Sequence, residues 1–145
     1  MLGRFADVSW AYRFGPPGHD VVVATLQRGD GKSVEVLSQA FRFPAGRPLQ
    51  MWSAEELGLR GTVRLGRDTT TLRLECRRLA YGVRIHVPGF APADDALTLE
   101  PGVPREIALF RMQGHERDAP VGGTLTALNL NCRIALGLDG GEQAS

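Results

Sequence analysis

Apolar and polar residues alternate with a period of two through most of this chain. In the segment 83–87, three branched apolar residues alternate with Arg84 and His86, and Pro88-Gly89 follows. Such alternation is typical of a strand with one buried and one solvated face. Proline cannot donate to a ladder and glycine accepts turn dihedrals, so the strand is expected to end there. The segment predicts one strand of a β-sandwich, with His86 facing solvent.

Short strands of this kind recur through the C-terminal two thirds of the chain. About seven fit within the last ~95 residues, with turn residues every ~8–12 positions, which is the pattern of an immunoglobulin-like sandwich. The predicted strands are 59–65, 70–76, 83–87, 97–99, 107–109, 125–127 and 134–136. The Cys…Trp…Cys pattern of antibody domains is missing, so the prediction is Ig-like only.

One helical turn is predicted before these strands, within Met51 to Gly58. Ser53 has the side chain of an N-cap, and Glu56 follows three residues later. This is the spacing of a capping box, in which each residue satisfies a backbone N–H of the other. Because Gly58 ends the segment, the helix has at most two turns.

The N-terminal part predicts only three strands, at 5–14, 21–26 and 34–43, with a hairpin turn at 29–32. So few residues bury too little surface to stand alone, which indicates the end of a preceding domain. We therefore expect an all-β chain: an immunoglobulin-like β-sandwich over 48–138, preceded by strands of a neighbouring incomplete β-sandwich and a linker (1–47) and followed by a disordered tail (139–145). Unpaired strand edges seek partners, which predicts a strand-mediated homodimer.

Composition and charge exclude several classes of partner. Hydrophobic residues make up 43% of the 145 residues, and the formal net charge of +1 is spread along the chain with both signs mixed. This favours neither nucleic acid nor an anionic membrane. No apolar run approaches the ~20 residues of a membrane span. The N-terminus also lacks the apolar core of a signal peptide, which favours a cytoplasmic location.

The side chains that usually carry chemistry form no recognisable motif. The three histidines are far apart and share no metal-ligand spacing, so neither a metal nor a cofactor is expected. Glu55 and Glu56 are neighbours on the predicted helix and point about 100° apart. Asp94 and Asp95 lie in a loop, where a solvated acidic turn is expected and the oxygens are too few for calcium. Catalysis by this chain alone is not expected.

Cys76 and Cys132 are the two cysteines. Both lie in apolar, strand-like segments, and free cysteine is among the most buried residue types. The prediction is two buried thiols, with a disulfide between the sheets as the alternative.

Three aromatic residues are candidates for contact with carbohydrate, because sugars stack on exposed rings. Trp10 and Tyr12 share one face of a predicted strand, and Trp52 follows the Pro-rich linker. The structural interpretation is that Trp10 and Tyr12 fill a core and that Trp52 packs the domain junction. The functional interpretation is a carbohydrate platform.

Several short motifs give the chain a resemblance to a known family. They are Leu72-Arg73-Leu74, Leu79-Ala80-Tyr81-Gly82-Val83, Pro88-Gly89-Phe90, Asp94, Leu99-Glu100-Pro101-Gly102 and Leu125-Thr126-Ala127-Leu128-Asn129, with Ala11 to Val21 upstream. In this order they resemble the C-terminal Ig-like domains of β-mannosidase-type enzymes of glycoside hydrolase family two.

The resemblance implies a multidomain parent that removes terminal β-D-mannose from the non-reducing end of oligosaccharides with retention of configuration. Its catalytic glutamates would lie on a TIM barrel, and this chain matches neither of their motifs. The chain would be a non-catalytic accessory region that packs against the catalytic and sister domains. Two alternatives stay open: an independent carbohydrate-binding module, and an adhesion sandwich of the fibronectin type.

Overall fold

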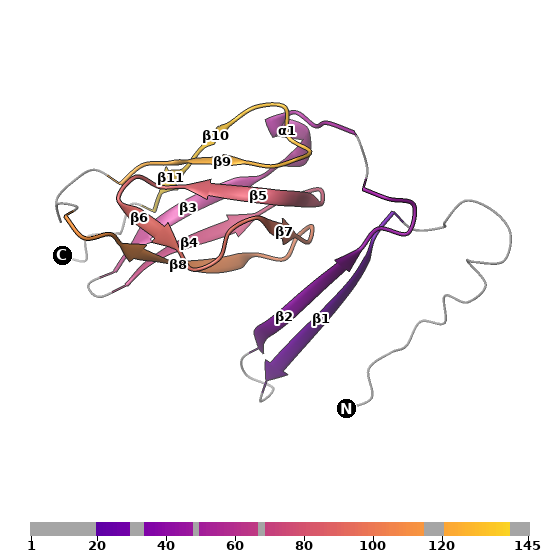
Figure 1. Ribbon diagram of the computed structural model, residues 1–145, viewed down its shortest axis with the longest axis horizontal. Coiled ribbons are helices and arrows are strands. Elements are labelled where there is room, and N and C mark those ends of the chain that lie inside the picture. The colour runs from indigo at the N-terminus through magenta and orange to yellow at the C-terminus, as the bar shows by residue number, and fades with distance from the viewer. Residues whose placement is uncertain (1–19, 30–33, 48–49, 67–68, 115–120, 140–145) are drawn as a thin grey trace, which may run out of the picture. The chain divides into compact units, whose positions relative to one another are not determined.

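The computed structural model describes residues 20–29, 34–47, 50–66, 69–114 and 121–139 (Figure 1). The chain divides into two compact units, Met1–Leu49 and Gln50–Ser145. The predicted first strand at 5–14, with Trp10 and Tyr12, lies outside the described residues.

The described part of the first unit is a β-hairpin. β1 (Val22–Gly29) pairs antiparallel with β2 (Val34–Arg42), and the register shifts between Leu26 and Gln27. These ranges confirm the predicted strands at 21–26 and 34–43. Within the described residues the hairpin is a two-stranded sheet, and it leaves Leu26 exposed.

The second unit is built almost wholly of strands. Its elements are α1 (Ala54–Leu57), β3 (Arg60–Leu65), β4 (Thr70–Glu75), β5 (Ala80–His86), β6 (Phe90–Pro92), β7 (Leu97–Leu99), β8 (Arg105–Arg111), β9 (Thr124–Thr126), β10 (Ile134–Ala135) and β11 (Gly137–Leu138). One sheet has the order β10-β9-β5-β7 and the other β11-β3-β4-β8-β6. Every pairing is antiparallel except that of β11 with β3. The all-β prediction is confirmed.

The two sheets form two layers (Figure 1), and buried side chains of both belong to one hydrophobic core. The period-two pattern decides which side chains enter it, as in β5, where Val83 and Ile85 are buried while Arg84 and His86 are exposed. The largest fully buried side chains come from both sheets and from α1: Leu57, Leu72, Leu74, Leu99, Leu125, Val63 and Val83. The unit therefore has a sandwich-like, two-layer construction.

The predicted helix is present and is capped as expected. The Ser53 Oγ accepts a hydrogen bond from the Glu56 N–H at 3.2 Å, and the Glu56 carboxylate accepts one from the Ser53 N–H at 3.0 Å. Gly58 ends the helix with a φ of 61°, and a Cβ there would collide with the Arg77 side chain. The Leu57 carbonyl then accepts hydrogen bonds from the backbone N–H groups of Arg77 and Arg78, which joins α1 to the turn after β4.

Three local predictions need correction. The stretch after Pro88-Gly89, expected as a loop, contains the short strand β6, because its backbone pairs with the distant β8. The single strand expected at 134–136 is divided, since β10 pairs with β9 and β11 crosses to β3. Cys132 is exposed rather than buried, in the loop before β10, whereas Cys76 is buried as predicted; neither forms a disulfide.

The ordered part of the unit also reaches beyond Leu138. The Asp139 N–H donates to the Val63 carbonyl at 2.9 Å, and its carboxylate pairs with Arg64 at 3.0 Å. The prediction of a disordered tail from 139 is therefore wrong for Asp139. The other residues of that predicted tail, 140–145, lie outside the described residues.

Candidate functional site

Trp52 is the sequence-predicted site residue that the structure describes, and it lies half-buried at one end of the second unit. Its backbone runs beside the loop between β9 and β10: the Trp52 N–H donates to the Asn129 carbonyl at 2.9 Å, and the Asn131 N–H donates to the Trp52 carbonyl at 3.0 Å. The Trp52 ring packs against the core. Arg78 covers the ring, with its guanidinium carbon 4.3 Å from the ring centroid.

The side chain of Asn129, in the loop between β9 and β10, is buried and hydrogen-bonds to the backbone near the start of β5. Asn129 is only 3% exposed, and it is the one buried polar or charged residue among the described residues. Its Oδ1 accepts from the Tyr81 N–H at 3.3 Å, and its Nδ2 donates to the Leu79 carbonyl at 2.8 Å. A buried amide is stable only when it is hydrogen-bonded, and this one satisfies two backbone groups at the start of β5.

A shallow hollow of about 450 Å³ opens on the solvent side of α1, lined by Glu55, Glu56, Arg77 and Arg78. Most of these polar groups already have an intramolecular partner. Glu56 belongs to the capping box, Arg77 donates to the Glu55 backbone carbonyl, and Arg78 lies over Trp52. The side chains of Glu56, Arg77 and Arg78 that line the hollow are therefore held by contacts within the fold.

The electrostatics of these carboxyl groups do not suit acid catalysis. A glycosidase acid needs a raised pKa. Hydrogen bonds from the backbone and side chain of Ser53 instead hold the pKa of Glu56 below its usual value. Glu55 and Glu56 are also consecutive on one helix, which does not give the facing carboxyl pair that such chemistry requires.

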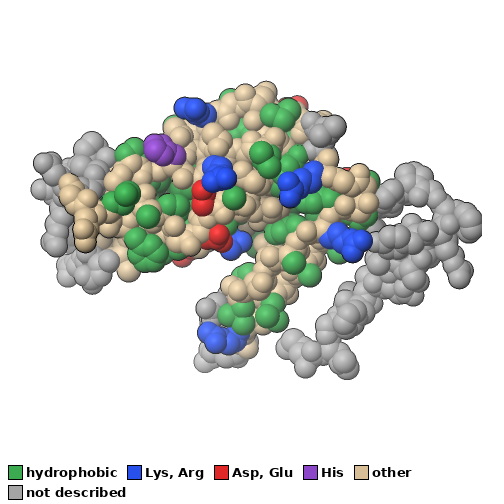
Figure 2. Space-filling view, viewed as in Figure 1, with side chains coloured by type: hydrophobic (Ala, Val, Ile, Leu, Met, Phe, Trp, Pro, Cys, Tyr) green, Lys and Arg blue, Asp and Glu red, His purple; other side chains and the backbone are tan. Residues whose placement is uncertain are grey.

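Asp94 and Asp95, expected as a solvated acidic turn, are both exposed and both form ion pairs. Asp95 pairs with Arg84 at 3.1 Å and Asp94 with Arg105 at 3.0 Å. In the described part of the chain, no group of three or more His, Cys, Asp or Glu side chains is placed to hold a metal ion. Nor is any described helix long and apolar enough to cross a membrane. Figure 2 shows basic side chains spread over one face of the second unit, with acidic ones near its middle, rather than gathered in a patch.

Two residues at this end, Arg78 and Asn129, are not among the site residues predicted from the sequence, although Asn129 ends the motif 125–129. Arg78 lies 26 positions from Trp52 along the chain, so only the fold brings them together. Asn129 did carry a signal, since it is an amide within the mostly apolar run 125–130. An amide in such a run is either exposed or hydrogen-bonded inside the core, and here it is the latter.

The chain was compared with protein-family models, with curated proteins and with solved structures, and no match was found in any of the three.

Proposed function

We propose that this chain is a non-catalytic accessory region of a β-mannosidase-like glycoside hydrolase, in which it packs against and supports the catalytic barrel and its sister domains. The parent enzyme would hydrolyse terminal non-reducing β-D-mannose residues. The observation that carries the proposal is that the motifs behind the resemblance that lie in the second unit build its framework. They contribute mainly buried side chains and turns, and the exposed carboxylate of Asp94 is paired with Arg105.

The start of β5 illustrates this best. The motif 79–83 and the motif 125–129 are 42 residues apart, and Asn129 hydrogen-bonds to two backbone groups of the first from within the second. Gly82 has a φ of 61°, and a Cβ there would lie 2.6 Å from the Leu128 side chain. A side chain at position 82 would therefore disrupt the contact between the motifs.

The turn motifs have the same character. In Pro88-Gly89-Phe90, Gly89 has a φ of 77°, the Phe90 N–H closes the turn onto the Val87 carbonyl at 3.0 Å, and the Phe90 ring is buried. In Leu99 to Gly102, Leu99 is buried and the Gly102 N–H donates to the Cys76 carbonyl at 3.0 Å. Both motifs supply a left-handed glycine beside a core residue.

An immunoglobulin-like arrangement is part of the proposal, and the strand order supports it. Constant-type Ig sandwiches have one sheet of strands A, B, E and D and another of C, F and G. Here β3-β4-β8-β6 follows the order A-B-E-D, and β5-β9-β10 follows C-F-G. β7 is added beside β5, and β11 beside β3.

The competing candidate is an independent carbohydrate-binding module that uses Trp52. Of the three predicted contact residues, Trp52 lies within the described part of the chain, and Arg78 lies over its ring. A sugar that stacks on this ring from the side of Arg78 would have to displace the guanidinium. The accessory role needs no such rearrangement.

The test is to titrate the purified chain with mannobiose, mannotriose and soluble mannan, by calorimetry and by amide NMR, and to assay it with p-nitrophenyl β-D-mannopyranoside. The proposal predicts neither saturable binding nor hydrolysis. Saturable binding that Trp52→Ala abolishes and that the control Trp52→Phe retains would overturn it in favour of the binding module. Hydrolysis above a mock-purified control would contradict its non-catalytic character.

A further inference from the structure

The segment between β5 and β8 crosses between the two sheets. It leaves β5 in the four-stranded sheet, pairs as β6 with β8 in the five-stranded sheet, and returns as β7 to pair with β5. Both β6 and β7 are three-residue edge strands. So few ladder bonds hold a segment weakly, and other contacts must fix its position.

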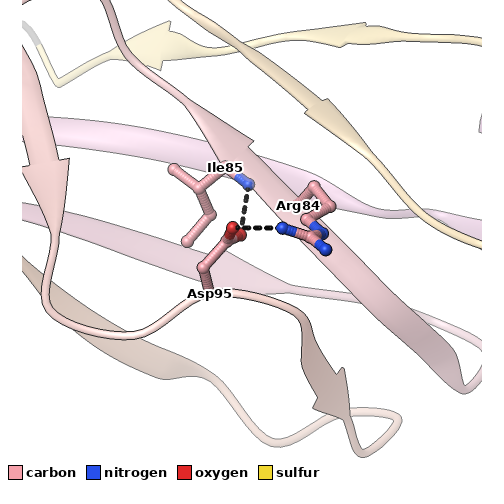
Figure 3. A network of polar contacts seen from close by, with 3 residues as sticks. All are labelled: Arg84, Ile85 and Asp95. Carbon is pink, nitrogen blue, oxygen red and sulfur yellow. Dashed lines mark hydrogen bonds and ion pairs between the residues drawn. The ribbon is translucent and has the colours of Figure 1, made fainter.

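Asp95 supplies one of these contacts by continuing the ladder of β7 with its side chain. Leu97 of β7 pairs with Val83, so position 95 comes level with Ile85 in the same register. There the Asp95 Oδ1 accepts the Ile85 N–H at 3.0 Å, while Oδ2 accepts from Arg84 at 3.1 Å (Figure 3). Ala96 lies between Asp95 and Leu97 in the chain. It has a φ of 58°, a left-handed conformation that ends the regular strand.

Asp94 supplies the second contact, on the other sheet. Its Oδ2 accepts from the Arg105 guanidinium at 3.0 Å, and Arg105 belongs to β8. Two consecutive carboxylates thus bind one arginine of each sheet. The Ala93 N–H, which donates to the Ala108 carbonyl at 2.8 Å, adds a backbone contact to β8 just before them.

We propose that Asp94 and Asp95 form an acid-sensitive clasp across the two sheets, and that protonation of Asp95 releases the turn 93–96 between β6 and β7. The buried side chains of Phe90, Leu97 and Leu99 keep the two flanking strands in the core. The clasp goes beyond the proposed accessory role and does not depend on it. Release of this turn would expose the Ile85 N–H to solvent.

The pKa of Asp95 supports the direction of this response. Partial burial raises it, but hydrogen bonds from the backbone N–H groups of Ile85 and Ala96 and from Arg84 outweigh that effect, so the net pKa lies below its usual value. A carboxyl with a depressed folded pKa stabilises the protein above its unfolded pKa and ceases to do so as pH falls through the folded value. The release therefore belongs below about pH 4.

The charged groups around the clasp are few. In the described residues, Arg84 of β5 and Arg105 of β8 contact the two carboxylates. His86, two residues along β5 from Arg84, has an exposed side chain on the same face. The substitution His86→Gln separates any effect of this histidine from that of the aspartates.

The experiment measures amide hydrogen exchange by NMR between pH 6 and pH 2.5, with each rate converted into a protection factor. The proposal predicts that protection of the Ile85 amide falls by about tenfold below pH 4, the scale of one weakened charge-assisted hydrogen bond. Leu72 and Leu74 of β4 should keep their protection. Asp95→Asn retains an acceptor oxygen but cannot titrate, so it should remove the step at Ile85. Asp95→Ala should lower the protection of Ile85 at every pH.

Asp139→Asn is the matched control, because it removes an exposed Arg–Asp ion pair of the same kind that does not touch the segment between β5 and β8. Its step at Ile85 should equal that of the unmodified chain. A step that survives in Asp95→Asn would overturn the proposal, as would a step that His86→Gln removes. Simultaneous loss of protection in β4 and β5 would also overturn it, since the opening would then be global.

Discussion

At the scale of single residues, the described polar side chains of the second unit act mainly on the fold. Asn129 joins β5 to the β9–β10 loop, Asp95 extends the ladder of β7, and Glu56 caps α1. Each of them accepts a hydrogen bond from a backbone N–H group, that of Tyr81, Ile85 and Ser53 respectively. Such positions are where a side chain adds most to a short-stranded fold, because the alternative is an unsatisfied backbone group.

Asn129→Ala should lower the free energy of unfolding by about 1–3 kcal/mol, because it leaves the Tyr81 N–H and the Leu79 carbonyl without their side-chain partner. Urea unfolding followed by tryptophan fluorescence measures the change. Asn131→Ala is the matched control, since Asn131 is exposed and its contact with Trp52 is made by its backbone. Equal effects of the two substitutions would contradict the role assigned to the Asn129 side chain.

The two thiols should differ sharply in reactivity. Burial raises the pKa of Cys76 to about 11, and its Sγ lies 3.6 Å from the carbonyl oxygens of Leu99 and Glu100, whereas Cys132 is exposed. Because the thiolate is the reactive form, Ellman's reagent at pH 8 should modify one thiol quickly and the second only after unfolding. Cys132→Ser should abolish the fast phase. A fast phase that survives in this variant would show that Cys76 is accessible.

At the scale of elements, a short helix such as α1 depends on the hydrogen bonds at its ends. Ser53→Ala removes the side-chain acceptor at the start of α1 and should cost about 1 kcal/mol of unfolding free energy, the usual effect of losing an N-cap. Ser53→Asp restores an acceptor at the same position and should recover most of the loss. Thermal denaturation followed by circular dichroism measures both. If the two variants were equally destabilised, the cap would not be what holds α1 in place.

The hairpin of the first unit carries the prediction of a strand-mediated dimer. An isolated two-stranded hairpin is marginally stable, and Leu26 on β1 is 61% exposed. Sedimentation velocity should show a dimer that dissociates on dilution and that Leu26→Lys weakens. Leu65→Lys, at an exposed leucine of the second unit, is the control and should leave it unchanged. A monomer at all concentrations, with protected amides in β1 and β2, would refute the dimer.

The elements also show what local sequence pattern can predict. Period-two alternation correctly identified β3, β4, β5 and β8 and the buried faces of β4 and β5. A strand with one buried and one solvated face has alternating apolar and polar residues, which can be recognised in the sequence. The alternation missed β6, since a three-residue strand that ends at Pro92 exists only through its pairing with β8. It also missed the exposure of Cys132 and the division at Leu136, which depend on where the chain changes sheets.

At the scale of the whole second unit, one core joins the two sheets, so a cavity in it should destabilise both together. Leu125→Ala, at a side chain with no exposed surface, should lower the free energy of unfolding by about 2–5 kcal/mol. Leu65→Ala, at a leucine that is 56% exposed, should cost far less. The amides of β4 and β9 should lose protection in parallel in the first variant. Loss confined to one sheet would contradict a shared core.

The candidate site could be anticipated only in part. The capping box was recognisable because both of its residues lie within one helical turn. The contact of Arg78 with Trp52 and the hydrogen bonds of Asn129 could not be placed, because each joins residues that are far apart in sequence. Trp10 and Tyr12, proposed with Trp52 as carbohydrate contacts, lie outside the described residues and stay predictions.

The most direct test of the proposed accessory role is to determine the coding sequence upstream of Met1. If the accessory role is correct, the reading frame continues upstream through the remaining strands of the first sandwich and a TIM-barrel pattern that carries two candidate catalytic glutamates. A stop codon followed by a ribosome-binding site directly before Met1 would contradict it. The chain would then be made by itself, and the carbohydrate-binding module would become the leading interpretation.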